Sequence, residues 1–136
     1  MKSKIYDMMY PLINDGQGIY ELTDLNAYID KIIEKGCIFS IIEKDVLLGF
    51  LAGYANDYEN KTGFLSMLIV SPSTRRMGYG RRLTDFFLTD LVHKGFERCH
   101  TEVKENNTLA LNVCKRAGFY ELGRNGKYII LEKLLK

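Results

Sequence analysis

One segment, residues 66–83, constrains the fold more than any other part of the chain. It runs from the apolar stretch Ser66–Val70 through a turn at Pro72 to two glycines, Gly78 and Gly80, and then into residues typical of a helix. Glycine adopts backbone angles that other residues avoid and leaves no side chain in the way. Consecutive N–H groups can therefore converge on an anion at the positive end of the following helix. The segment predicts a strand, a phosphate-binding loop and a helix, in that order.

Two common phosphate-binding motifs do not fit this loop. The dinucleotide fingerprint needs a third glycine where the chain has Leu83, and it belongs to a first strand–helix–strand unit and not to the middle of a chain. The Gly-x-x-x-x-Gly-Lys-Ser/Thr loop of ATP- and GTP-binding proteins occurs nowhere in the sequence. Arginines at positions 75, 76, 81 and 82 surround the glycines. They suit a small polyanion, because a net charge of +2 is too small to indicate a nucleic-acid-binding face.

The composition favours one domain spanning residues 1–136. Hydrophobic residues make up 46% of the chain, enough to fill a core without disulfide or metal support. The three cysteines form no Cys-x-x-Cys pair, and His93 and His100 have no partner at ligand spacing, so we expect no metal site. Reduced thiols indicate a cytoplasmic protein. No signal peptide is recognisable and no apolar run is long enough to cross a bilayer.

Hydrophobic periodicity predicts an ordered series of helices and strands. Helices are predicted over residues 3–14, over 24–35 with Thr23 or Asp24 as the cap, from the glycine loop to about 94, and over 107–118. Strands are predicted over residues 37–43, 46–56, 64–70, 98–104, 120–123 and 127–134. This pattern is typical of an α/β fold with a mixed sheet and helices on both faces. The crossover from 64–70 to 98–104 predicts that these two strands are parallel.

The chain resembles a known family through two motifs. The motifs, in the family's order and spacing, are Arg75-x-x-Gly78-x-Gly80 and Asn107-x-x-Ala110 followed by Gly118-Phe119. They resemble the pyrophosphate loop, and the segment after it, of the GCN5-related N-acetyltransferase (GNAT) family. The resemblance covers roughly residues 46–123 and implies the GNAT fold, a mostly antiparallel sheet with a splayed parallel pair at its centre. Family members usually open with a strand, for which residues 1–5 supply only a stub.

The resemblance also implies acetyl-CoA as cosubstrate. In the family, the pantetheine arm lies against the exposed edge of the third strand, beside its parallel neighbour. By their offset from Arg75, Val70 would contact this arm and the Leu68 N–H would polarise the acetyl carbonyl. The other cofactor-binding residues implied are Arg75, Arg76, Met77, Gly78, Tyr79, Gly80, Arg81 and Asn107.

The acid and the base are where the chain departs from the family's pattern. Cys114 stands where many members place a tyrosine that protonates the leaving thiolate. Its thiol has three interpretations: a proton donor or water anchor, a transiently acetylated nucleophile, or a small buried filler. Phe64 stands where histone-acetylating members carry a glutamate base. Four base candidates rest on location alone: Asp57, Glu59, Tyr54 and Glu21.

Together these features predict an acetyl-CoA-dependent N-acetyltransferase that acts on the primary amine of a small molecule by direct attack on the thioester. An amino sugar is favoured over a peptide amine, because the histone-type glutamate is absent and aromatic residues, 12% of the chain, can stack on a sugar face. The alternative is a CoA-binding module without catalysis, either regulatory or structural. We expect neither nucleic acid nor a membrane as partner, and the apolar last strand, Tyr128–Leu135, predicts a homodimer.

Overall fold

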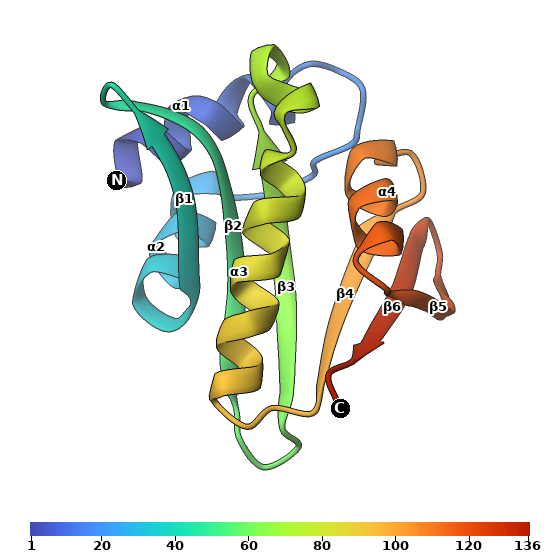
Figure 1. The fold of residues 1–136 in the computed structure, drawn as a ribbon. Coiled ribbons are helices and arrows are strands. Elements are labelled where there is room, and N and C mark those ends of the chain that lie inside the picture. Colours follow the sequence, from blue (N-terminus) through green and yellow to red (C-terminus); the bar gives the residue numbers. More distant parts are fainter.

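Helices lie on both faces of one six-stranded sheet in the computed structural model, which describes residues 1–136 (Figure 1). The helices are α1 (Lys2–Ile13), α2 (Leu25–Lys35), α3 (Tyr79–His93) and α4 (Thr108–Arg116), with a 3₁₀ helix, η1 (Pro72–Met77), before α3. The strands are β1 (Cys37–Glu43), β2 (Val46–Asp57), β3 (Thr62–Val70), β4 (Arg98–Lys104), β5 (Tyr120–Asn125) and β6 (Tyr128–Leu134). The predicted fold class is confirmed.

The strands lie side by side in the order β1-β2-β3-β4-β6-β5. β3 and β4 pair in parallel, with α3 in the connection between them, and all other neighbouring pairs are antiparallel. The parallel pair predicted from the sequence is therefore confirmed. It stands at the centre of the sheet, and Figure 1 shows its two strands diverging toward the end that carries η1 and α4.

The helix ends follow from local chemistry in the sequence. The Asp24 carboxylate accepts a hydrogen bond from the Ala27 backbone N–H at 3.0 Å, which caps α2. In the same way, the Asn107 side chain accepts from the Ala110 N–H at 3.2 Å and caps α4. Gly118 follows α4 with a φ of 98°, a left-handed conformation that glycine adopts without strain. The second motif of the sequence is thus a cap, a helix and a stop.

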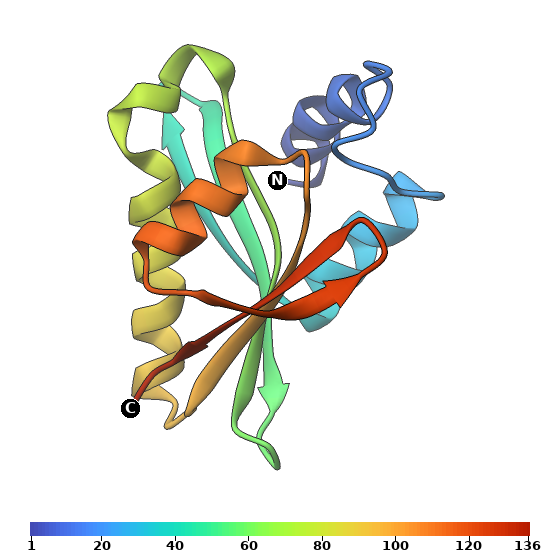
Figure 2. The same ribbon diagram turned by 90° about the vertical axis from the view of Figure 1, so that its right-hand side faces the viewer.

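Two apolar clusters hold the helices to the sheet. The larger one packs α3 and α4 against one face, through residues such as Leu83, Phe87 and Leu111. The smaller one packs α1 and α2 against the other face, through residues such as Ile5 and Ile29. Figure 2 shows the two helix pairs on opposite sides of the sheet. The smaller cluster contains no residue of β4, β5 or β6, so α1 and α2 cover only the half of their face formed by β1, β2 and β3.

The structure differs from the sequence-based predictions at both ends of the chain. Residues 2–5 belong to α1 and form no strand, so β1 is an edge of the sheet. The last strand, β6, lies between β4 and β5 and is paired on both sides. The prediction that this strand pairs across a homodimer axis is therefore wrong, because β5 folds back as a hairpin onto its free edge. None of the helices is long and apolar enough to cross a membrane.

Candidate functional site

The site begins where β3 and β4 part. Their parallel pairing ends at Leu65 and Thr101. At the same level the register between β2 and β3 shifts: Gly53 faces Leu65 and Ala52 faces Met67, which leaves Ser66 as the extra residue of a β-bulge. A bulge bends its strand and ends regular pairing. The gap between β3 and β4 thus has a local cause in one extra residue.

The bulge also decides which backbone groups face the gap. Before it, the Leu65 carbonyl oxygen accepts a hydrogen bond from Thr101 Oγ1 of β4 at 2.8 Å. After it, the Ser71 N–H donates to the Leu48 carbonyl oxygen at 2.8 Å, toward β2. Because successive residues of a strand present their backbone groups to opposite sides, Val70 and Leu68 point away from β2 and into the gap. These are the two residues whose backbone the family resemblance assigns to pantetheine and the acetyl carbonyl.

The gap contains a cavity of about 210 Å³. Its walls come from the gap strands, from the N-terminal half of α4 and from the connection between α1 and α2. The lining residues include 19–22 of that connection, Tyr28 of α2, 65–68 of β3, 101–104 of β4, Asn107, Ala110 and Cys114 around α4, and Tyr128 of β6. Four parts of the chain that are distant in sequence therefore meet at the gap.

The glycine loop presents free amides beside this cavity. Gly78 has a φ of 76° and precedes α3, whose first turn has neither a side-chain cap nor an acidic residue. The first backbone bond of the helix runs from the Arg82 N–H to the Gly78 carbonyl oxygen. The amides of Tyr79, Gly80 and Arg81 precede this bond and lie at the positive end of the helix. A pyrophosphate fits this donor set.

Glycine is needed in this loop for a second reason. A Cβ atom on Gly80 would lie 3.1 Å from Cγ2 of Val113 on α4 and 3.8 Å from side-chain atoms of Leu68 and Val70. The start of α3 therefore approaches both α4 and β3 closely. Position 78, in contrast, has open space around it, so its glycine serves the backbone conformation and access to the loop.

The loop side chains divide into anchored and free groups. The Arg81 guanidinium donates to Asp85 Oδ1 at 3.0 Å and to the Arg116 carbonyl oxygen at 2.9 Å, at the end of α4. The Arg81 side chain therefore links the start of α3 to the end of α4. Arg75, Arg76 and Met77 are exposed on η1. The charge of Arg75 is felt by the buried Tyr20 hydroxyl across the cavity, where it partly offsets the rise in pKa that burial causes.

The structure places Cys114 in the cavity wall but makes its thiol weakly acidic. The residue is only 1% exposed, and burial raises the pKa of its thiol to about 12. A neutral thiol is a poor nucleophile and a reluctant proton donor. The geometry therefore favours the interpretation of Cys114 as a buried filler over that of an acetylated intermediate.

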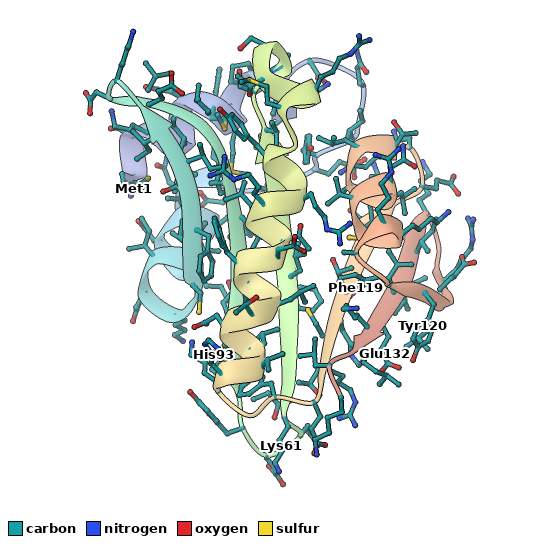
Figure 3. The ribbon with its side chains drawn as sticks, viewed as in Figure 1. Met1, Lys61, His93, Phe119, Tyr120 and Glu132 are labelled. Carbon is teal, nitrogen blue, oxygen red and sulfur yellow. The ribbon has the colours of Figure 1, made fainter.

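Most of the base candidates predicted from the sequence lie away from the cavity. Asp57 is the last residue of β2, and Glu59 is in the β2–β3 turn, which Lys61 marks in Figure 3, at the opposite end of β3 from the gap. The Asp57 carboxylate accepts a hydrogen bond from the Asn60 N–H at 3.1 Å and so stabilises that turn. Tyr54 lies beneath the Lys31 ammonium, 5.6 Å from it, and does not line the cavity. The structure brings none of these three residues into the site.

Glu21 does line the cavity, but its carboxylate is bound to the Lys104 ammonium. Lys104 is 7% exposed and also donates to the Gly18 carbonyl oxygen. The hydrogen bond from Lys104, more than any other influence, lowers the pKa of Glu21. Glu21 is therefore a structural partner of Lys104 and a weak base.

Sequence analysis missed Glu102, which lines the cavity from β4. Its side chain is exposed and takes part in none of the ion pairs of the chain, so it is the one cavity carboxylate without a cation partner. Alternation along residues 98–104 places Glu102 on the same face as Lys104 and His100. That alternation was readable in the sequence, but the gap beside it was not.

His100 has a carboxylate partner in the fold that the sequence spacing did not reveal. Its Nε2 lies 2.7 Å from Glu132 Oε2 on β6, and the Tyr120 hydroxyl donates to the same carboxylate (Figure 3). These two hydrogen bonds, that from Tyr120 first, lower the pKa of Glu132. The partner was hidden because it lies 32 residues further along the chain. His100 lies opposite Phe64 in the β3–β4 ladder, in the part where the two strands are still paired.

Comparison with known proteins agrees with this geometry. The model of the acetyltransferase (GNAT) family matches residues 5–119. The chain belongs to this family. GNAT proteins are N-acetyltransferases that use acetyl-CoA as cosubstrate, so the chain is an N-acetyltransferase by family. No curated protein sequence matches the chain significantly.

Several solved GNAT structures share the fold at low sequence identity. The PaiA N-acetyltransferase of Thermoplasma acidophilum in complex with coenzyme A is 15% identical, with a TM-score of 0.77 over 98% of this chain and 92% of that one. The aminoglycoside 6'-N-acetyltransferase of Enterococcus faecium is 14% identical, with a TM-score of 0.79 over 99% and 91%. The ribosomal-protein-S18-alanine N-acetyltransferase of Escherichia coli is 16% identical, with a TM-score of 0.78 over 99% and 88%. Such identities establish the fold alone.

Proposed function

We propose that the chain transfers the acetyl group of acetyl-CoA to the primary amine of a small molecule by direct attack on the thioester. The observation that carries this proposal is the continuity of the site. Backbone groups of Leu68 and Val70 face a gap that leads to free amides at the start of α3. An extended arm ending in a pyrophosphate has the shape and charge that such a path would hold.

In this proposal the chain holds the cofactor mainly through its backbone. The amides of residues 79–81 bind the pyrophosphate, Arg75 and Arg76 add positive charge, and Met77 and Gly78 complete the loop. Val70 and Asn107 hold the arm, and the Leu68 N–H polarises the carbonyl to be attacked. When bound, acetyl-CoA supplies the activated acetyl thioester.

Glu102 is the base that the geometry supports. It lies on β4 across the gap from Ser66, it lines the cavity, and it has no cation partner. An amine arriving as an ammonium ion would meet this carboxylate and lose its proton to it, directly or through a water. Cys114 remains a candidate water anchor, since its thiol stays protonated and can donate a hydrogen bond.

The acceptor favoured from the sequence, an amino sugar, is the first class of compound to test. Its support is the predicted stacking on aromatic residues, three of which, Tyr20, Tyr28 and Tyr128, line the cavity. Among the structural neighbours, the Enterococcus faecium enzyme is an aminoglycoside acetyltransferase, while the Escherichia coli enzyme acts on the alanine of a ribosomal protein. These neighbours differ in acceptor, so acceptor class has to come from this chain's own cavity.

The test is thiol release from acetyl-CoA with glucosamine, spermidine and a short peptide with a free N-terminus as acceptors. Release that depends on an added amine supports catalysis. If acetyl-CoA raises the thermal midpoint of the protein but no amine gives release, the alternative of a CoA-binding module without catalysis is favoured.

A further inference from the structure

The cavity is small for a site that must bind an acceptor. At about 210 Å³ it is below the usual range of about 300–1,000 Å³ for small-molecule pockets. The acetyl group of the cosubstrate would take part of that room. Only a slender part of an acceptor can enter.

The wall of the cavity that faces the α1–α2 connection is mainly apolar. Ile19 and Leu22 come from that connection, Met67 comes from β3, and the rings of Tyr28 and Tyr128 complete the wall. Such a wall stabilises methylene groups when they leave water. It offers few hydrogen-bonding groups in exchange for the hydration of a hydroxyl group.

Most polar side chains of the cavity are already bound to the protein. The Tyr28 hydroxyl and Ser66 Oγ lie 2.8 Å apart, and Thr101 Oγ1 donates to the Leu65 carbonyl oxygen. Lys104 is taken by Glu21 and Gly18, and the Asn107 side chain caps α4. Glu102 is therefore the one cavity carboxylate free to meet a ligand, beside the hydroxyl of Tyr128, and its charge selects an amine.

From this distribution we infer that the cavity takes a primary amine at the end of a slender, apolar stem and excludes hydroxyl-bearing rings. The inference rests on the proposed function and narrows its acceptor. A sugar qualifies only if its amine is carried on an arm outside the ring, so that the ring and its hydroxyl groups remain in solvent.

The experiment compares two amines with the same six-carbon chain. n-Hexylamine carries no hydroxyl group. 1-Amino-1-deoxyglucitol carries a hydroxyl group on each carbon except the one that bears the amine. The thermal midpoint of the CoA-saturated protein is measured against each amine, followed by thiol release from acetyl-CoA, with rates expressed per free amine. We expect the apparent affinity and kcat/KM to be at least about tenfold higher for hexylamine than for 1-amino-1-deoxyglucitol, because most of the buried hydroxyl groups would lack partners.

A variant extends the test to the wall itself. Met67→Gln places a polar side chain of similar length in the cavity wall. It should lower the ratio of kcat/KM for hexylamine to kcat/KM for the hydroxylated amine. Met8→Gln is the matched control, because Met8 is half-buried on α1 and does not line the cavity. It should leave the preference unchanged.

The outcomes separate this inference from the proposed function. Two results would overturn the inference while the cofactor assignment stands, provided that acetyl-CoA binds. In the first, the hydroxylated amine is bound or acetylated no less efficiently than hexylamine. In the second, neither amine binds at about 10 mM or below. If acetyl-CoA itself does not bind, the proposed function fails first, and the inference falls with it.

Discussion

Gly78 is the residue at which the cofactor assignment can be tested by charge alone. Asn and Asp tolerate its φ of 76° better than other non-glycine residues do, and nothing lies within 4 Å of an added Cβ atom. We predict that Gly78→Asp weakens acetyl-CoA binding about 100-fold, because a carboxylate beside a pyrophosphate costs a few kcal/mol. Gly78→Asn should stay within about tenfold of the wild type. The measurement is calorimetric titration of both variants, and equal losses in the two would remove charge as the cause.

Glu102 is the residue that carries the proposed proton transfer. We predict that Glu102→Gln lowers kcat by about 10²–10⁴-fold at neutral pH and leaves acetyl-CoA affinity unchanged, because the amide cannot accept the ammonium proton. Steady-state thiol-release kinetics give the first quantity and titration gives the second. The control is Glu43→Gln, an exposed acid at the end of β1 without an ion pair. A kcat that survives in Glu102→Gln would assign the base elsewhere.

Residue types alone could predict the cofactor loop but not the base. Gly78, Gly80 and Asn107 act through backbone freedom or capping, which are local properties that a sequence displays directly. Glu102 becomes special only because β3 diverges beside it, and this divergence depends on a bulge that forms between β2 and β3. This divergence depends on β2, β3 and β4 together, so the alternation of residues along β4 alone does not predict it.

The connection between α1 and α2, residues 14–24, crosses the cavity and is called the strap. It is fastened to β4 and its following turn by Lys104, which bonds to Glu21 and Gly18, and by Asn106 Nδ2, which donates to the Gln17 carbonyl oxygen at 3.3 Å. Because the Lys104 side chain is buried, its charge depends on Glu21 for compensation. One largely exposed carboxylate therefore compensates the buried charge that fastens the strap.

We predict that Glu21→Gln frees the strap while the sheet stays intact. Amide hydrogen exchange over residues 17–22 should accelerate about tenfold or more, because local opening no longer has to break an ion pair. The matched control is Asp30→Asn, which removes the exposed Lys2–Asp30 pair between α1 and α2. Since the pKa of Glu21 is lowered from 4.5, the pair holds above that pH and is lost as pH falls through the lowered value. Unchanged exchange in Glu21→Gln would show that the strap does not depend on the pair.

Element boundaries were predictable where local signals mark them. Residues 37–43 and 98–104 are strands at the predicted bounds, and α2 begins after its predicted Asp24 cap. The third strand begins at Thr62, before the predicted start, because its first residues are polar or glycine and pair only through the sheet. The position of the last strand depends on the β5 hairpin, a long-range arrangement that periodicity cannot reveal.

Across the whole molecule, stability should fall in alkaline solution because two thiols are buried. Burial raises the pKa of Cys99 and of Cys114 from 9.0 to about 12. Between these values the unfolded chain releases protons that the folded chain keeps, so the free energy of unfolding decreases as pH rises. The decrease is up to about 1.4 kcal/mol per pH unit for each thiol. Urea unfolding at pH 8 and pH 10 measures it, and Cys114→Ser should flatten the slope. Equal stability at both pH values would contradict the burial of the thiols.

The central claim for the molecule is that the β3–β4 gap and the start of α3 form one continuous cofactor path. The most direct measurement is residue-resolved amide NMR of the protein with and without acetyl-CoA. We expect the amides of Leu68, Val70 and residues 79–81 to shift and gain protection from exchange together, while the β2–β3 turn around Lys61 stays unchanged. Binding that left these amides unaffected, or that perturbed the turn in their place, would show that the gap and the start of α3 do not form one cofactor path.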